Sequence, residues 1–450
     1  MLERLSFKHL GPSPSMTLEF GERLNLLTGD NGLGKTFVLD AAWWALTRTW
    51  AEGRMLQPDP QAEGEPEIDY DVRGVMGKTT HAECGFDFEH YEWRGKPGRP
   101  SIPGLVVYAR IDGGFSIWDP ARNYWRNDED ESRTETQRPP AYQFNREQIW
   151  TGLWRTPKDE YEKNRDALLC RGLLDDLASW QIDPAEAEAQ QLFANVLLEL
   201  SPHANEPLQL GPSVELWGRA GKVPTLVVPY AEHPVPLEHA SAGVKRAVAL
   251  AYALVWAWVS HQKALRMTKK KVTEAHQIVL LFDEMEAHLH PQWQRRILPA
   301  LLRAVNSRLL RGAEVPVQVI GTTHAPLVLA SVETEFNKET DRLFNFELKA
   351  NGQVEVQEVE YAKHGDVVSW LESEAFDMDS GYSVEAEAAM KEAGDFMAGS
   401  GSQDDETRMV IAARLRKALG GDDPFLVEWF AKTRPEVLRS AAQARTGRRG

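Results

Sequence analysis

The stretch "LLTGDNGLGKTFVLDAAW", Leu26 to Trp43, decides how the rest of the chain is interpreted. Apolar residues of strand character run into a glycine-rich turn, and the sequence after Lys35 and Thr36 has the pattern of a helix start. The segment from Gly29 to Thr36 fits the P-loop pattern, in which a glycine and four further residues precede Gly-Lys-Ser/Thr. This pattern predicts a loop that binds phosphate groups between a strand and a helix.

Each residue type in this loop has a physical task at a phosphate. Glycines let successive backbone N–H groups curl around the phosphate oxygens, and the N-terminus of the following helix adds a positive dipole. The lysine would reach the β- and γ-phosphates, and the threonine hydroxyl would ligate Mg²⁺. The predicted nucleotide-binding residues of the loop are Gly29, Asn31, Gly32, Gly34, Lys35 and Thr36.

The stretch "QIVLLFDEMEAHLHP", Gln277 to Pro291, supplies acidic residues for a metal ion. Five apolar residues from Ile278 to Phe282 predict a fully buried parallel strand, and Asp283 and Glu284 follow at its carboxyl end. We expect Asp283 to hold Mg²⁺ through water and Glu284 to polarise an attacking water molecule. An apolar run that ends in two acids is common. In a chain that also carries a P-loop, it specifically indicates a metal site for the bound nucleotide.

The acidic pair, the "HLHP" after it and the motif spacing resemble the ABC-type ATPase heads of the SMC, RecF and OLD group. In that group a Ser-x-Gly signature loop begins a helix and supplies the second half of the nucleotide site. Ser241 and Gly243 in "EHASAGVKR" stand at those positions. Ser241 would cap the helix and direct its hydroxyl and the free N–H groups at a γ-phosphate. The alternative is that Ser241 only caps a core helix.

The same resemblance assigns two further site residues. His324 in "GTTHAPLVLAS" matches the family's switch histidine, which can hydrogen-bond a γ-phosphate or the attacking water. Ala325 stands where the family usually has serine, so one local hydrogen bond of the pattern is left open. The glutamine that links the metal to the helical lobe has three candidates, Gln143, Gln148 and Gln181, of which Gln148 is preferred.

The resemblance implies an α/β fold: a P-loop NTPase of ABC-ATPase type with a mixed sheet, an antiparallel β subdomain and a helical lobe. Residues 1–146 are expected to hold the first half of the core with the β subdomain, and 147–240 a helical lobe and a hairpin. Residues 241–360 would form the second half of the core, and 361–450 a C-terminal helical segment. Leucine spacing between Glu147 and Leu200 predicts helix there, including Leu168, Leu169, Leu173, Leu174 and Leu177.

Composition limits the class of protein. Of 450 residues, 42% are hydrophobic and 26% are charged, as in ordinary globular proteins. The apolar run Ala247 to Val259 covers 13 residues, too few to cross a bilayer, and predicts a buried helix. The charged N-terminus does not resemble a secretion signal, and two cysteines are too few for a disulfide framework or a thiolate zinc site. These features predict a cytoplasmic protein without a membrane segment.

Net charge bears on the partners. A charge of −16 argues against a surface that binds a polyanion as a whole, although it does not exclude a local basic groove.

The resemblance implies a head-to-tail homodimer that encloses two ATP molecules with Mg²⁺, closing on binding and opening on hydrolysis. It is closest to the compact ATPases of antiphage systems such as Septu, PARIS and the ATPase-bearing retrons. That likeness suggests control of a separately encoded effector, a nuclease or toxin.

Three other functions are weighed against this one. A DNA-repair ATPase of RecF type would need a local basic groove, and an ATP-bound scaffold would not need Glu284. A nuclease on the same chain would use Asp377 and Asp379, but the segment before them is amphipathic rather than a buried strand. His288 and His290 lack a third metal ligand in register and are interpreted as structural residues or as part of a dimer loop.

Overall fold

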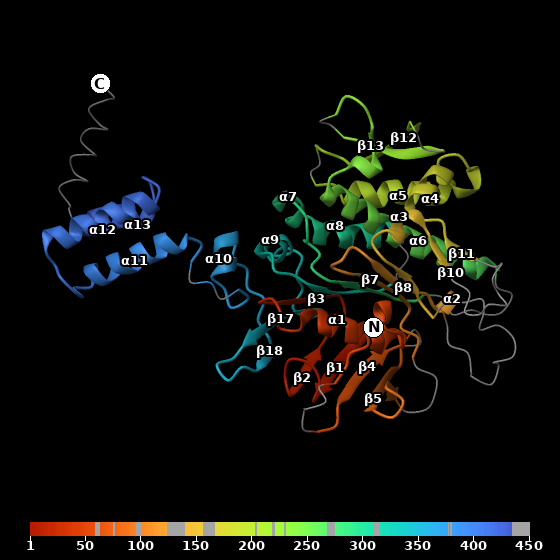
Figure 1. Ribbon diagram of the computed structural model, residues 1–450, viewed down its shortest axis with the longest axis horizontal. Helices are drawn as coiled ribbons and strands as arrows, with labels where there is room; N and C mark the ends of the chain where they lie inside the picture. The colour runs from red at the N-terminus through yellow and green to blue at the C-terminus, as the bar shows by residue number, and fades with distance from the viewer. Residues whose placement is uncertain are drawn as a thin grey trace. The chain divides into compact units, whose positions relative to one another are not determined.

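The computed structural model describes most of the chain (Figure 1). It covers residues 1–58, 64–74, 77–95, 101–123, 140–155, 167–202, 205–217, 221–228, 231–267, 275–309, 315–376, 378 and 380–433. The chain forms two compact units, one of Met1–Trp370 with Glu374–Phe376 and one of Leu371–Ser373 with Asp377–Gly450. The four-part division expected from the sequence stays a prediction.

A mixed sheet forms the centre of the larger unit. Among the described residues it has eight strands in the order β18-β17-β3-β16-β15-β7-β8-β9. The five neighbours from β17 to β7 run parallel, and the strands outside them pair antiparallel. The bounds are β3 Leu24–Gly29, β7 Leu105–Ala109, β8 Phe115–Trp118, β9 Tyr142–Phe144, β15 Ile278–Phe282, β16 Val317–Thr322, β17 Asp341–Leu348 and β18 Val354–Glu358.

Strand polarity explains where the site forms. Parallel strands end at the same edge of a sheet, and ligands of such sheets bind at the carboxyl ends. β16 lies between β3 and β15, so the loops that follow these three strands meet at one edge. The predicted buried strand before Asp283 is confirmed, because all five residues of β15 are buried.

A second sheet covers helix α1. Its described strands follow the antiparallel order β2-β1-β4-β5-β6. α1 lies between this sheet and the central sheet (Figure 1), and its buried Trp43 and Trp44 contribute to the core that the two sheets share. The predicted antiparallel β subdomain is therefore confirmed. The bounds are α1 Lys35–Thr47, β1 Leu2–Lys8, β2 Ser15–Glu19, β4 Glu67–Arg73, β5 Thr79–Asp87 and β6 Glu92–Gly95.

Helices pack on the opposite face of the central sheet. Side chains alternate along the strands, so that Leu26 of β3 joins the helical core and Leu27 joins the α1 core. α6 begins after Ser241, as predicted, and is long and apolar enough to cross a membrane, but 72% of its most apolar window is buried. The helices of this layer are α4 Leu173–Trp180, α5 Ala187–Glu199, α6 Ala242–Met267, α8 Ile297–Arg303 and α9 Pro326–Ser331.

Shorter elements connect the layers. Turns at Asp112-Gly113-Gly114 and Asn351-Gly352 connect the hairpins β7–β8 and β17–β18, and the hairpin expected within residues 147–240 is β12–β13. The remaining bounds are η1 Ala51–Gly53, α2 Pro120–Asn123, α3 Gln148–Thr151, β10 Leu153–Arg155, β11 Ala167–Cys170, η4 Pro184–Glu186, β12 Gln209–Glu215, β13 Lys222–Val227, β14 Val235–Pro236, η5 Leu237–His239, α7 Pro291–Gln294, η6 Ala304–Leu309 and α10 Val367–Leu371.

One helix prediction in the lobe is wrong. Leu168 and Leu169 belong to strand β11, which pairs antiparallel with β10, and helix α4 begins only at Leu173. Gly172 separates the two elements with a φ of 86°, a conformation that a right-handed helix does not contain. Short apolar runs do not distinguish strand from helix by spacing alone, and here the glycine decides.

The C-terminal unit is helical, as predicted. α11 (Val384–Met397), α12 (Asp405–Ala418) and α13 (Pro424–Thr433) enclose a small core of their own. Side chains of Ser383 and Asp404 cap α11 and α12, which fixes where these helices begin. Asp377 and Asp379, the candidate nuclease acids, lie outside the described residues.

Candidate nucleotide site

The glycines of the loop from Gly29 to Thr36 adopt the positive φ angles that a phosphate-binding turn requires. Gly29 has a φ of 117° and Gly34 a φ of 96°, and a Cβ atom on Gly29 would lie 2.2 Å from the carbonyl oxygen of Phe346. Asn31 and Gly32 are exposed on the loop. Gly34 is the N-cap of α1 and has no side chain with which to cap the helix, so the N–H groups of the first turn are available to an anion.

Gly29→Ala is therefore expected to lower the melting temperature and weaken nucleotide binding. The left-handed backbone alone costs an alanine about 1–2 kcal/mol, and the clash with β17 adds to this cost. Differential scanning fluorimetry with and without ATP measures both effects. Gly32→Ala is the matched control for the melting temperature without ATP, since Gly32 has a φ of 81° but a Cβ atom there would meet no atom of the described residues within 4 Å. Equal losses in the two variants would contradict the clash.

Lys35 lies at the centre of the loop. Its ammonium Nζ donates hydrogen bonds to the carbonyl oxygens of Gly29 at 2.8 Å and Asp30 at 2.6 Å. The residue is only 5% exposed. Burial lowers the pKa of Lys35 to about 8, although the neighbouring carboxylates of Glu284, Asp30 and Asp283 oppose the shift. The buried loop therefore stabilises the charged form of Lys35 less well than water does.

Asp283 joins the loop to the neighbouring strands. The hydroxyl of Thr36 donates to both carboxylate oxygens of Asp283, at 3.0 and 2.9 Å. Thr322, at the end of β16, donates to the same carboxylate at 2.9 Å. Burial raises the pKa of Asp283, while these hydroxyls and the charges of Arg246 and Lys35 oppose the shift. A hydroxyl beside a carboxylate is an oxygen ligand set that suits Mg²⁺, so Thr36 and Asp283 could hold it.

Glu284 is held next to this pair in an unusual conformation. Its φ is 46°, which is rare for a residue with a side chain. The backbone N–H of Glu284 donates to the Thr322 hydroxyl at 2.8 Å. Burial, followed by the charge of Asp283, raises the pKa of the Glu284 carboxyl. A carboxylate with raised pKa beside a metal-binding acid can accept a proton from water.

His324 faces Glu284 from the loop after β16. Its Nε2 atom lies 3.7 Å from Oε1 of Glu284, and its backbone N–H donates to Glu286 at 2.6 Å. Burial, with the charge of Lys35, lowers the pKa of His324, so the ring is neutral near pH 7. The structure thus brings Lys35, Thr36, Asp283, Glu284 and His324 together at one edge of the sheet.

Part of this chain is similar in sequence to a known protein family. Residues 109–330 match the family described as "AAA domain, putative AbiEii toxin, Type IV TA system". This match and the geometry of the site support a P-loop ATPase of ABC type. The matched residues include β15, the acid pair after it and β16, whereas the loop on β3 lies before the matched range.

The fold is also similar to three solved structures at low identity. The SMC head domain from Thermotoga maritima is 14% identical with a TM-score of 0.39, covering 80% of this chain and 99% of that one. The SmcHead bound to the C-winged helix domain of ScpA is 16% identical with a TM-score of 0.41, covering 80% and 98%. The recombination mediator RecF-ATPrS is 15% identical with a TM-score of 0.39, covering 80% and 98%.

The two predicted signature residues, Ser241 and Gly243, lie at the start of α6. Ser241 is exposed, and its hydroxyl accepts a weak hydrogen bond from the N–H of Val244 at 3.4 Å. Gly243 is buried, and a Cβ atom there would lie 2.9 Å from the ring of Trp293. Gly243 therefore has a packing role that the sequence motif did not indicate. A second molecule can reach Ser241.

The candidate glutamines occupy different surroundings. Gln181 uses both ends of its amide within the lobe, donating to the Gly211 carbonyl and accepting from Ser213, which favours a structural role. Gln143 accepts hydrogen bonds from Ser116 and Glu52. Gln148 accepts from the N–H of Asn145 in its own turn. The assignment of Gln148 to the metal stays a prediction.

Three residues of the site were not singled out from the sequence. Thr322 bonds both Asp283 and Glu284, Glu286 holds the backbone of His324, and Trp293 packs against Gly243. The only signal for Thr322 and Glu286 is their position within the quoted motifs. His290 caps α7 by accepting from the N–H of Gln292, in agreement with its structural interpretation.

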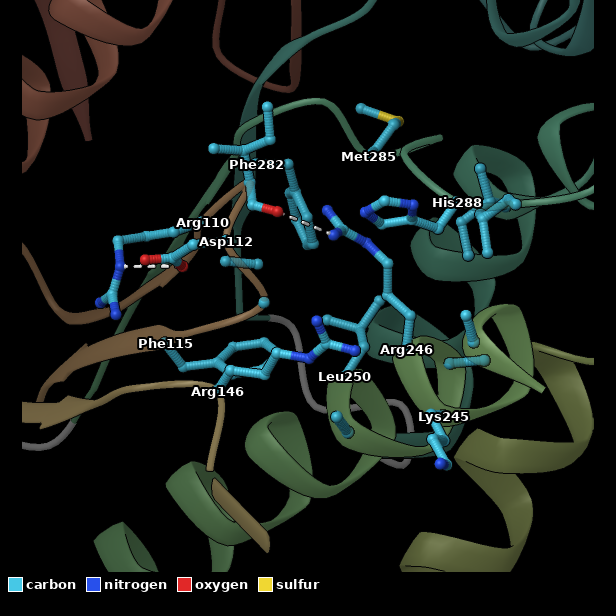
Figure 2. Close-up of a pocket in the computed structure, with 18 of the residues that line it drawn as sticks. Arg110, Asp112, Phe115, Arg146, Lys245, Arg246, Leu250, Phe282, Met285 and His288 are labelled. Atoms are coloured by element: carbon cyan, nitrogen blue, oxygen red, sulfur yellow. Dashed lines mark hydrogen bonds and ion pairs between the residues drawn. The ribbon is translucent and has the colours of Figure 1, made fainter. Parts of the chain in front are cut away.

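A pocket lies beside the acid pair, between α6, α8 and the β7–β8 turn (Figure 2). Its volume is about 90 Å³, which holds a few water molecules and is too small for a nucleotide. Neither Lys35 nor Thr36 lines it. Arg110, Arg146, Lys245, Arg246 and His288 surround it with positive or titratable groups, against the single carboxylate of Asp112.

Proposed function

We propose that this protein binds ATP with Mg²⁺ at the loop on β3 and hydrolyses it. The observation that carries the proposal is the convergence of Lys35, Asp283, Glu284 and His324 from three loops onto one edge of the sheet. A scaffold that only bound ATP would not need Glu284 and His324 beside the metal-binding acid. Both lie there, at 3.7 Å from each other.

The residues have distinct tasks in this mechanism. Lys35 exchanges its two carbonyl partners for the β- and γ-phosphate oxygens, and the N–H groups of α1 bind the same phosphates. Thr36 and Asp283 would hold Mg²⁺, which neutralises phosphate charge when bound. Glu284 orients a water molecule for attack on the γ-phosphorus and accepts its proton. Neutral His324 donates or accepts a hydrogen bond beside that water.

A head-to-tail dimer would complete the site. Ser241 bonds only its own helix among the interactions described above, and it is exposed at the N-terminus of a 26-residue helix. A helix N-terminus attracts anions. In the proposed dimer, Ser241 and Gly243 of one copy face the γ-phosphate bound by the other copy.

Mixing two inactive variants tests the dimer. Lys35→Met and Ser241→Arg are each expected to lose ATP hydrolysis, because every site of either homodimer lacks one half. In a mixed dimer one site has both halves intact, so the mixture regains up to about a quarter of the wild-type rate. Phosphate release measured against the mixing ratio checks this. If the mixture stays inactive while both variants fold and exchange subunits, the composite site is wrong.

For the biological role, we propose that ATP turnover controls a separately encoded effector, a nuclease or toxin, in antiphage defence. The matched family description names a toxin of a toxin–antitoxin system, which supports a role of this class. The C-terminal unit has its own core, as expected of a module that binds a partner.

Affinity purification of the full chain from its own host tests this role. We expect a protein encoded beside its gene to co-purify, and its yield to differ between wild type and a hydrolysis-deficient variant. Duplex DNA bound at micromolar affinity with a steep salt dependence, and without such a protein, would instead support the DNA-repair alternative.

A further inference from the structure

The backbone of Glu284 needs external support. A non-glycine residue with a φ of 46° is strained and persists only where its surroundings fix it. Thr322 bonds the N–H of Glu284 from one side at 2.8 Å. On the other side, the carbonyl oxygen of Glu284 accepts from the N–H of Ala287 at 2.9 Å and from the guanidinium of Arg246 at 3.0 Å. Of these supports, only Arg246 comes from the helical layer.

Among the described residues, the hydrogen bonds of the Arg246 guanidinium all go to backbone carbonyls. Besides Glu284, its guanidinium donates to the carbonyl oxygens of Asp283 at 3.4 Å and Ile111 at 3.3 Å. Figure 2 shows the side chain pointing from α6 into the pocket, beside Phe282, Met285 and His288. A planar guanidinium holds its N–H donors in fixed directions, whereas the donors of an ammonium rotate, so an arginine positions several carbonyls more rigidly than a lysine. These contacts therefore fix the backbone around Glu284, in addition to placing a positive charge near four acids, Glu286, Asp283, Glu284 and Asp112.

The same helix carries the signature serine. Ser241 precedes α6 and Arg246 lies in its second turn, so both move with the N-terminal end of the helix. The pocket of about 90 Å³ beside the guanidinium leaves room that a close-packed interior would not offer. A small shift of this end of α6 can therefore change the contacts of Arg246 without opening the core.

We propose that Arg246 is a positioning residue that links contact at Ser241 to the backbone of the catalytic Glu284. The inference rests on the proposed function, because it requires ATP hydrolysis and a partner copy that engages Ser241. When a partner's nucleotide contacts the start of α6, Arg246 sets the Glu284 carboxylate for attack of water. Without that contact, turnover is slow even when ATP is bound.

Two substitutions of Arg246 distinguish the effect of its hydrogen bonds from the effect of its charge. Arg246→Met removes both the charge and the planar guanidinium donors, and Arg246→Lys retains only the charge. Each variant is expected to lower kcat about 100-fold, the effect of a misplaced catalytic group, with unchanged ATP affinity and ATP-dependent dimerisation. Arg266→Met is the matched control and should retain wild-type turnover, because Arg266 lies on the same helix, is exposed and forms its ion pair with Glu188 at 3.7 Å.

A double-mutant comparison tests whether Arg246 acts through Glu284. In a Glu284→Gln background, Arg246→Lys should cause no further loss of turnover, whereas a residue that acts independently would add its own effect. Full activity of Arg246→Lys, or a parallel fall of ATP affinity and kcat, would overturn the inference. If Arg246→Met does not fold, Arg246→Lys decides. A wild-type protein that neither hydrolyses ATP nor dimerises would instead overturn the proposed function.

Discussion

Glu284→Gln is expected to lower kcat for ATP hydrolysis by about 100-fold or more, the usual contribution of a general base. The amide cannot accept a proton from the attacking water, while Lys35, Thr36 and Asp283 remain to bind the phosphates and the metal. ATP affinity should therefore stay near the wild-type value, and the ATP-bound dimer should persist because hydrolysis no longer opens it. Single-turnover phosphate release and sedimentation with ATP measure the two effects.

An exposed acid provides the control for this substitution. Glu339→Gln makes the same chemical change at an exposed position outside the site, and it should leave turnover unchanged. Two results would refute the role of Glu284. Unchanged turnover would show that another group accepts the proton, and loss of ATP binding would show that Glu284 supports the loop rather than the chemistry.

Features encoded by neighbouring residues could be predicted from the sequence. The loop on β3 depends on glycines whose backbone needs are local, and the burial of β15 follows from five consecutive apolar residues. The start of α6 at Ser241 follows from a capping residue before an apolar run. The order of these motifs along the chain was enough to anticipate an α/β fold with its acids at the strand ends.

Features that depend on distant contacts could not be predicted in this way. Thr322 bonds Asp283 across 39 positions, and Arg246 bonds the carbonyl of Glu284 across 38. A backbone carbonyl has no sequence signature, so nothing near Arg246 indicates its acceptors. Gly243 matched a motif, yet its contact with Trp293 became visible only in the fold. The strand at Leu168 was missed because its apolar spacing also suits a helix.

The charge state of Lys35 leads to the second large effect, a fall of ATP affinity above pH 8. Burial lowers the pKa of Lys35 from 10.5 to about 8 in the unliganded protein, so near pH 9 most molecules carry a neutral amine. Phosphate oxygens favour the charged form and raise this pKa. Binding must then take up a proton, and affinity falls by up to about tenfold per pH unit.

Isothermal titration calorimetry in buffers of different ionisation enthalpy measures that proton directly. With ATP in EDTA, uptake should approach one proton near pH 9 and be small at pH 7, and Lys35→Met should remove it. The folding stability of the unliganded protein changes with pH in the opposite direction from ATP affinity: it rises above pH 8. Its lowered pKa disfavours folding below pH 8, and this penalty fades as pH rises toward 10.5, where the unfolded chain also loses the proton. Constant affinity from pH 7 to 9.5 would mean that Lys35 stays charged in the empty loop.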